Sequence, residues 1–405
     1  MVEIFYGSNG NTINVTNICF DKLKKHDIIT IPNDDNSRNL YFSDVSYGRI
    51  KFIYILINSV ISKYSSTRLV KINTKENIIK SINMPTILYG VYGNTINVTN
   101  ICLNQLTNNN IITIPNNDDT RNQYFTDPCY GTQKFVFIHY DDDDDDNDII
   151  YQYNTEYFIK IDMNNSRLSV AKVKTNVWDN NNINNKLNLL YSELKLNNNT
   201  NSEETSENKM VIRYLTGKET VLKIGGNLGK NSLLVSYILG GNNSLVTLEN
   251  DESIVKLLTL DRDLNNLNFH IENSMLSMRT LIQNDCNIIQ SKTLDEGYSL
   301  VNTINLTDLK KKYNVDFDTL ILNCSGLFYY ILMDMPEILN NINLIITKND
   351  YEDISCKEYV DKVLKENDFY VDCVEIKENI EEKFKPLQNR FFEVWKKLEY
   401  SVVSK

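Results

Sequence analysis

The sequence predicts two β-rich modules followed by a larger α/β domain built on a doubly wound, mainly parallel sheet. Three observations support this prediction. A segment of about fifty residues near the N-terminus returns, without gaps, at an offset of 83 residues. A polar, Asn-rich stretch then separates the duplication from the rest of the chain. Beyond residue 220, short apolar runs alternate with longer amphipathic segments, which is the pattern of parallel strands joined by helices.

These features divide the 405 residues into four parts. The first β-rich repeat takes residues 1–85, the second takes 86–176, an Asn-rich linker takes 177–208, and the α/β domain takes 209–405. One helix is expected over residues 187–196 of the linker. The rest of the linker has too little apolar content to pack.

Both repeats carry the same string of residues. Asn11-Thr12-Ile13-Asn14-Val15-Thr16-Asn17-Ile18-Cys19 returns as Asn94-Thr95-Ile96-Asn97-Val98-Thr99-Asn100-Ile101-Cys102. Short runs of Ile, Val, Tyr, Phe and Thr, separated by Gly, Asn-Asp and Pro, predict short strands and turns. Arg, Asp and Tyr positions are also shared, and Arg38 matches Arg121. These shared positions either form equivalent ligand pockets or fix turns in each copy, and we favour the turns.

The second repeat is longer by six residues, which the Asp run at 141–146 accounts for. We interpret the run as a solvated loop, because contiguous Asp residues lack the spaced ligands and the turn Gly of a calcium site. A duplicated β-rich module without evident chemistry is typical of a binding or packing unit, so a protein partner is expected here. The repeats are similar to repeats of giant-virus proteins, a resemblance that implies a viral chain.

Composition excludes several functional classes. The net charge is −11, so there is no overall attraction to nucleic acid or to an anionic membrane. The N-terminus has no basic segment followed by an apolar one, and no apolar run approaches membrane-spanning length, which predicts neither a signal peptide nor a membrane span. Seven Cys without a CxxC pair predict reduced thiols. We therefore expect a cytoplasmic protein, in the host cytoplasm or the virion if the chain is viral.

The α/β domain opens with a strand, a glycine-rich loop and a helix. Strands are expected at 220–224, 244–248, 267–271, 317–322 and 344–347, and helices at 231–239 and 251–266. In such a sheet the ligand lies at the carboxyl ends of the strands, where glycines let the backbone approach it closely. Glu249 follows Gly225 by 24 residues and ends the second strand, which suits a hydrogen bond to ribose hydroxyls.

A longer string identifies the family that the domain resembles. Val221-Leu222-Lys223-Ile224-Gly225-Gly226-Asn227-Leu228-Gly229-Lys230-Asn231-Ser232 is similar to motif I of the FkbM methyltransferases. Phe317-Asp318-Thr319-Leu320-Ile321-Leu322-Asn323-Cys324-Ser325-Gly326 resembles the family's FDTLxxDCEG segment. The resemblance implies a Rossmann-like class I methyltransferase domain that transfers methyl groups from S-adenosyl-L-methionine (SAM) to a hydroxyl of a sugar or glycan. It also implies a set of cofactor-binding positions: Lys223, Gly225, Gly226, Asn227, Gly229, Asn231 and Glu249.

The family's acids are replaced at several of its motif positions. Lys223 and Lys348 stand where the resemblance implies acids, and so do Asn323 and Ser325, which leaves the catalytic residues unknown. The predicted site is more positive than the family's by about six charge units. Two like charges about 4 Å apart cost on the order of 4 kcal/mol at an effective dielectric constant of 20, so Lys223 is expected to weaken the binding of the SAM cation.

Two functions therefore remain open. The first is SAM-dependent O-methylation of a sugar or glycan hydroxyl by a degenerate site. The second is an inactive pseudoenzyme without a cofactor, which serves as a binding or scaffold protein. Its ligand would be a protein partner or an anionic nucleotide attracted by the two lysines.

Overall fold

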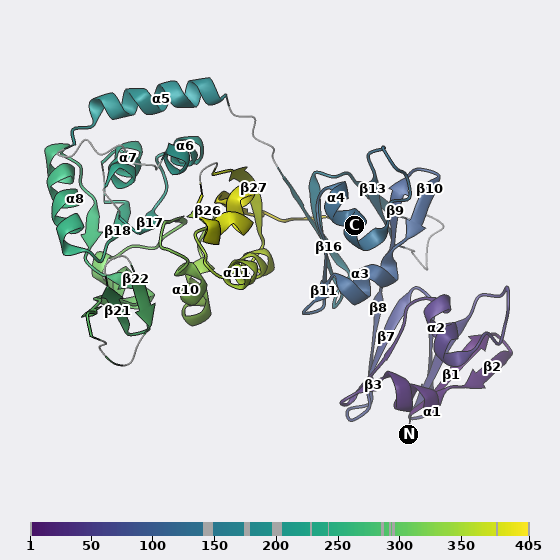
Figure 1. The fold of residues 1–405 in the computed structure, drawn as a ribbon. Coiled ribbons are helices and arrows are strands. Elements are labelled where there is room, and N and C mark those ends of the chain that lie inside the picture. Colours follow the sequence, from purple (N-terminus) through teal and green to yellow (C-terminus); the bar gives the residue numbers. More distant parts are fainter. Residues whose placement is uncertain are drawn as a thin grey trace. The chain divides into compact units, whose positions relative to one another are not determined.

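The structure is a computed structural model and divides into two compact units. One unit contains Met1–Lys174 and Glu399–Lys405, and the other contains Thr175–Leu398 (Figure 1). The structure describes residues 2–403 except 141–148, 174–178, 197–204, 227–228, 242, 285–286, 291–292, 294–295 and 378–379. The Asp run at 141–146 and the glycine-loop residue Asn227 lie outside the described residues.

Each repeat of the first unit folds into two small antiparallel sheets, as the short apolar runs predict. The first repeat has sheets of order β2-β1-β5-β6 and β3-β4-β7-β8. Their strands are β1 (Val2–Ser8), β2 (Asn11–Asn14), β3 (Lys24–Lys25), β4 (Ile28–Ile31), β5 (Phe52–Ile57), β6 (Val60–Tyr64), β7 (Arg68–Asn73) and β8 (Ile78–Asn83).

The second repeat has the same topology with one addition. Its sheets have the orders β10-β9-β13-β14 and β11-β12-β15-β16-β29. Their strands are β9 (Thr86–Val91), β10 (Asn94–Asn97), β11 (Thr107–Asn108), β12 (Ile111–Ile114), β13 (Phe135–Tyr140), β14 (Ile149–Tyr153), β15 (Tyr157–Asp162), β16 (Arg167–Lys172) and β29 (Ser401–Val402). The added strand β29 comes from the C-terminal residues and pairs with β16.

The two repeats are packed together through apolar side chains and share helices at equivalent places. Leu69, Ile82 and Met84 of the first repeat belong to the core of the second. Helices α2 and α4 begin after equivalent cap residues, because Asp34 and Asn117 each accept a backbone N–H of the first turn. The helical segments are α1 (Thr16–Ile18), the π-helix Cys19–Leu23, α2 (Asp35–Phe42), α3 (Thr99–Gln105) and α4 (Asp118–Phe125).

The second unit is built on one seven-stranded sheet of order β19-β18-β17-β25-β26-β28-β27. Numbered along the chain from β17, this order is 3-2-1-4-5-7-6, and only the pairs that involve β28 are antiparallel. The strands are β17 (Val221–Ile224), β18 (Leu245–Leu248), β19 (His270–Glu272), β25 (Thr319–Leu322), β26 (Leu344–Lys348), β27 (Phe369–Glu375) and β28 (Phe392–Lys397). The doubly wound sheet predicted from the sequence is confirmed, and its topology is the Rossmann-like methyltransferase fold.

Helices cover both faces of this sheet, because successive strand residues point to opposite sides. Leu222 and Ile224 face a core that includes residues of α9, α10 and α11, whereas Val221 faces a core with α5, α6, α7 and α8. These helices are α5 (Asn180–Glu193), α6 (Thr205–Tyr214), α7 (Lys230–Ile238), α8 (Glu252–Leu264), α9 (Leu306–Tyr313), α10 (Phe328–Asp334) and α11 (Ile354–Glu366). Two 3-10 helices follow α10 and β27, at Pro336–Leu339 and Glu382–Arg390.

Two features go beyond the sequence analysis. Within the expected linker, helix α5 begins at Asn180 rather than at residue 187, and its Ile183, Leu187 and Leu190 are buried in the core of the second unit. Small strands also form an insertion between β19 and α9. They are β20 (Met275–Leu276), β21 (Leu281–Asn284), β22 (Asn287–Gln290), β23 (Ser299–Leu300) and β24 (Thr303–Ile304). Among the described residues, no helix is both long and apolar enough to cross a bilayer.

Candidate functional site

The glycine loop leaves β17 at the carboxyl edge of the sheet, where two of its glycines are required by packing. Gly225 has φ of 92°, and a Cβ there would lie 1.9 Å from the backbone oxygen of Asn323 at the end of β25. Gly229 has φ of 93°, and its Cβ would lie 2.9 Å from a methyl carbon of Leu258 on α8. Positive φ and close approach both favour glycine. The fold alone therefore explains why these two positions are Gly.

Gly226 and Glu249 lie together, as the spacing of the two motifs predicts. A Cβ at Gly226 would lie 3.0 Å from Cβ and 3.4 Å from Oε2 of Glu249. Glu249 is 7% exposed, and its Oε1 accepts a hydrogen bond of 3.0 Å from the backbone N–H of Asp251. A carboxylate next to a glycine at the end of the second strand is the arrangement that binds ribose hydroxyls in doubly wound folds.

Asn231 points into the domain rather than along the loop. It is fully buried on α7, and its Nδ2 donates a hydrogen bond of 2.7 Å to Oδ1 of Asn208 on α6. Its own Oδ1 is buried without a hydrogen-bond partner. Asn231 therefore joins two helices, and its role as a cofactor contact stays a prediction.

Lys223 is fully buried and pairs with an acid that the sequence analysis did not identify. Its Nζ lies 3.2 Å from Oε1 of Glu207 on α6, and the Glu207 side chain is 3% exposed. Residues 206–208 fall in the predicted linker, although the apolar Met210, Val211 and Leu215 that follow them indicate an amphipathic helix. The positive charge expected at this position is therefore balanced inside the protein.

The remaining substituted positions join the same polar network. Asn323 donates from Nδ2 to Oε2 of Glu207 at 3.1 Å, and its Oδ1 accepts from Nζ of Lys348 at 3.3 Å. Lys348 also pairs with Oδ2 of Asp350 at 3.2 Å. The other oxygen of Asp350, Oδ1, accepts the backbone N–H of Gly326 at 3.1 Å. Three strand ends and α6 are thus linked by one continuous chain of contacts.

This network corrects the expectation of a strongly positive site. It contains two lysines and two acids, so its formal charge is zero. Lys223 and Lys348 each have a carboxylate within 3.2 Å, and both oxygens of Glu207 are occupied. Ser325, by contrast, is exposed with φ of 49°, and none of the described contacts that form the network involves it. The structure thus brings Lys223, Asn323 and Lys348 together and leaves Ser325 outside.

The ionisable groups beside the network hold their protons. Burial raises the pKa of the Cys324 thiol to about 12. Burial also raises the pKa of the Tyr351 hydroxyl well above its usual value. Neither group is ionised near neutral pH, so neither is a ready nucleophile or general base. Within the described residues, no group of three or more His, Cys, Asp or Glu side chains is arranged to hold a metal ion.

The shared polar residues of the two repeats fix the local structure of each copy. Arg38 is fully buried and donates to the backbone oxygens of Pro32, Ser65 and Arg68, and Arg121 makes equivalent bonds. This arrangement agrees with the turn-fixing interpretation, because Nε and Nη2 of each Arg are bound to backbone carbonyls. Nη1 of each Arg is buried without a hydrogen-bond partner.

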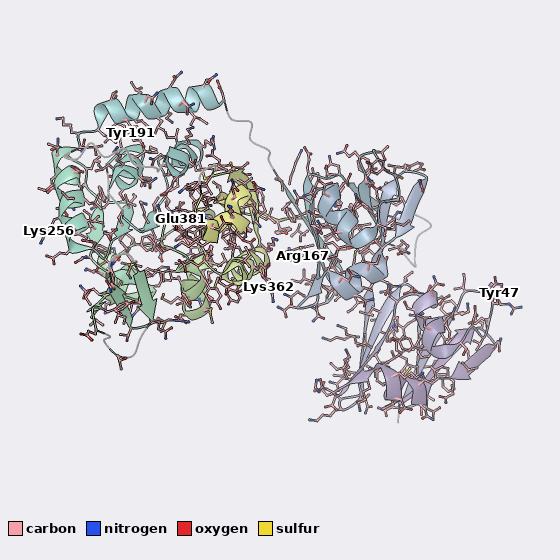
Figure 2. All side chains as sticks on the ribbon, viewed as in Figure 1. Tyr47, Arg167, Tyr191, Lys256, Lys362 and Glu381 are labelled. Carbon is pink, nitrogen blue, oxygen red and sulfur yellow. The ribbon has the colours of Figure 1, made fainter. Side chains whose placement is uncertain are left out.

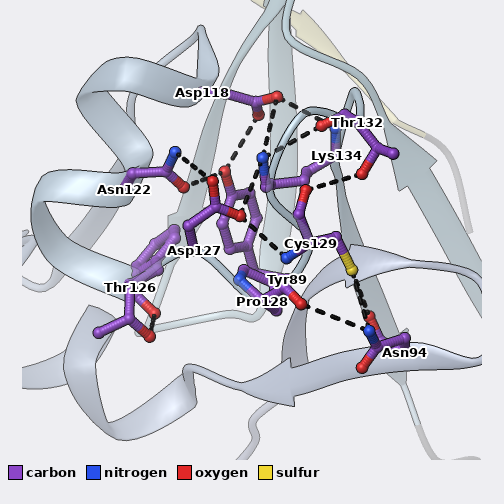
Figure 3. Close-up of polar contacts among 11 residues, drawn as sticks. Tyr89, Asn94, Asp118, Asn122, Thr126, Asp127, Pro128, Cys129, Thr132 and Lys134 are labelled. Carbon is purple, nitrogen blue, oxygen red and sulfur yellow. Dashed lines mark hydrogen bonds and ion pairs between the residues drawn. The ribbon is translucent and has the colours of Figure 1, made fainter.

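A second shared cluster surrounds a tyrosine in each repeat. Figure 3 shows it in the second copy, where the Tyr89 hydroxyl bonds to Asp118 and Asn122 at 3.0 and 2.8 Å. Nζ of Lys134 lies 3.0 Å from Oδ1 of Asp127 and 4.0 Å from Oδ2 of Asp118. The same contacts recur at equivalent residues of the first copy, including the Tyr6 hydroxyl. The duplicated network therefore joins the helix, the following turn and the sheet in both repeats.

Comparison with known proteins finds likeness at the level of fold. No protein-family model matches the chain, and no curated protein matches it. The FkbM assignment therefore remains a resemblance. Solved structures do match, over about half of the chain. A ribosomal protein L11 methylase from Lactobacillus delbrueckii subsp. bulgaricus is 12% identical, with 50% of this chain and 80% of that chain covered and a TM-score of 0.30.

Two further structures are similar to the same extent. An rRNA methylase from Streptococcus thermophilus is 11% identical, with 49% of this chain and 99% of that chain covered and a TM-score of 0.31. An O-methyltransferase from Bacillus cereus in complex with SAH is 13% identical, with 56% and 93% covered and a TM-score of 0.29. The methyltransferase fold of the C-terminal half is assigned from its own strand order.

Proposed function

We propose that the C-terminal domain is a pseudo-methyltransferase: a binding module that accepts the adenosine part of a SAM-like ligand and does not transfer methyl groups. The observation that carries this proposal is the neutral network of Lys223, Glu207, Asn323, Lys348 and Asp350. It occupies the motif positions where the family resemblance implies acids.

The residues fit one end of the cofactor and not the other. Gly226 beside Glu249 suits a ribose, because Oε2 of Glu249 lies next to the glycine and a carboxylate oxygen accepts hydrogen bonds from ribose hydroxyls. The methionine end carries a sulfonium and an ammonium against one carboxylate, and needs acids that are not already paired. Both oxygens of Glu207 are taken by Lys223 and Asn323. A cation entering there would have to break a buried ion pair, which is strongly unfavourable.

The network also argues against two other functions. Deprotonation of an acceptor hydroxyl needs a base, but Asp350 already pairs with Lys348 and accepts the N–H of Gly326. Binding of an anionic nucleotide needs an unbalanced positive charge, and both lysines have carboxylate partners. A protein partner bound through the repeats stays a separate prediction.

Calorimetric titration of the full chain with adenosine, SAM and SAH tests the proposal. We expect adenosine to bind and SAM to bind no more tightly, because the methionine end finds no unpaired acid. Glu249→Gln should weaken adenosine binding by roughly tenfold, through loss of a charged hydrogen-bond acceptor. SAM binding at least about tenfold tighter than adenosine, or label transfer from methyl-labelled SAM to a glycan, would favour the active O-methyltransferase instead. Absence of adenosine binding would contradict the retained ribose site.

A further inference from the structure

A polar cavity of about 350 Å³ lies where the second repeat covers the first. Eleven residues line it, and ten of them are Asn, Asp, Ser or Thr. Met84 is the single apolar residue among them and is 2% exposed. Asn100 of the second repeat donates a hydrogen bond of 3.1 Å to Ser37 of the first, which ties the two repeats together beside the cavity. The lining belongs to both repeats, so the cavity is a product of the duplication.

Two acceptor atoms of this lining are buried without partners. Asn33 is 7% exposed, and its Oδ1 has no hydrogen-bond partner. Asp34 uses Oδ1 to cap helix α2 through the N–H of Ser37 at 2.7 Å, but its Oδ2 is buried and has no partner. A buried polar atom without a partner costs free energy comparable to a lost hydrogen bond. Both atoms have almost no accessible surface, so the two side chains must turn towards the cavity before a ligand can donate hydrogen bonds to them and remove this cost.

The chemistry of the lining selects the class of ligand. The lining contains two Asp and no Lys or Arg, so it disfavours phosphates, carboxylates and other anions. A calcium ion takes six or more oxygen ligands, whereas the buried acceptors without partners in this lining are one carboxylate oxygen and one amide oxygen. Asp35 is already held by the Tyr6 hydroxyl and Lys51. Acceptor atoms on two consecutive residues, within a lining of hydroxyls and amides, match the hydroxyl groups of an uncharged sugar.

We propose that the cavity between the repeats binds an uncharged pyranose sugar through Asn33 and Asp34. The hydroxyl groups of the sugar donate to Oδ1 of Asn33 and Oδ2 of Asp34, and its C–H surface lies against Met84. Exposed Asn36, Asn97 and Asn100 provide the amide donors and acceptors nearest to solvent. The proposal is independent of the adenosine site, because it concerns the other unit of the chain.

The duplication supplies matched variants for the test. Asp34→Asn removes the unpartnered carboxylate oxygen and keeps the helix cap, since Asn117 caps α4 at the equivalent position. Asn33→Ala removes the other acceptor. Asn116→Ala changes the residue of the second repeat that is equivalent to Asn33 and does not line the cavity. All three variants should unfold at temperatures near that of the parent chain, which circular dichroism checks.

Saturation-transfer difference NMR with D-glucose, D-galactose, D-mannose and N-acetyl-D-glucosamine measures binding to the full chain. We expect at least one sugar to bind the parent and Asn116→Ala equally, and to bind Asn33→Ala and Asp34→Asn about tenfold more weakly. N-acetylneuraminic acid should bind more weakly than the uncharged sugars. The proposal is overturned if none of the four sugars binds, if both cavity variants bind like the parent, or if CaCl₂ binds and displaces the sugar.

Discussion

Removing the charge of Glu207 should destabilise the second unit far more than removing a surface charge. Glu207→Gln leaves the ammonium of Lys223 fully buried with an amide in place of its carboxylate partner, since the two side chains are 3% and 0% exposed. Breaking a buried pair in this way costs about 3–5 kcal/mol. For a unit of this length that corresponds to a fall in melting temperature of roughly 6–20 °C.

The assay is urea unfolding followed by tryptophan fluorescence, to which Trp395, fully buried in this unit, contributes. The matched control is Glu252→Gln on α8, whose pair with Lys256 is 2.8 Å long but has side chains 73% and 70% exposed. Lys256 is labelled in Figure 2. The control should change stability far less than Glu207→Gln does, because water and salt screen a solvent-exposed pair.

A double variant separates the pair from its surroundings. Lys223→Met with Glu207→Gln removes both charges and keeps an amide oxygen for Asn323, so it should be less destabilised than Glu207→Gln alone. The reasoning is refuted if Glu207→Gln costs no more than Glu252→Gln. It is also refuted if the loss of stability in the double variant equals the sum of the losses in Glu207→Gln and Lys223→Met. Either result would mean that Lys223 is not held as a buried cation by Glu207.

Three further outcomes follow from the contacts described above. Arg38→Lys should destabilise the first unit by about 3 kcal/mol in urea unfolding, because an ammonium cannot replace the guanidinium bonds to three backbone carbonyls. A loss of stability below about 1 kcal/mol would contradict the role of these bonds. Burial raises the pKa of Cys19 to about 12 from the usual 9. The buried neutral thiol therefore contributes to the stability of the first unit below about pH 9, and this contribution is lost as pH rises towards 12. Urea midpoints across this range should fall, and Cys19→Ala should flatten the fall. Gly225→Ala should cost about 3 kcal/mol or more of stability, because the new Cβ meets the backbone oxygen of Asn323. Gly240→Ala has open space around its Cβ and should cost about 1–2 kcal/mol. Equal costs in urea unfolding would refute the close approach at Gly225.

Much of the fold follows from local patterns. The strands and helices expected around Gly225 and Glu249 agree with the structure to within a few residues at most of their ends. The reason is that the period of apolar residues and the positions of turn glycines are set by neighbouring residues along the chain. The duplication likewise predicted two copies of one β-rich module. The predicted start of helix α5 lies too far along the chain, because the first turns are Asn-rich. In the structure, Asp179 caps them and Ile183 packs in the apolar core of the second unit.

The candidate site divides in the same way. The sequence alone determined which residues stand at the strand ends: Lys223, Asn323 and Lys348 in place of acids, with Glu249 retained. It could not determine their charge balance, because electrostatic pairing depends on distance in space and has no period along the chain. Only the tertiary structure placed Glu207 of α6 against Lys223 and Asn323. That contact balances the positive charge expected at Lys223, so the network of described residues at the strand ends is formally neutral.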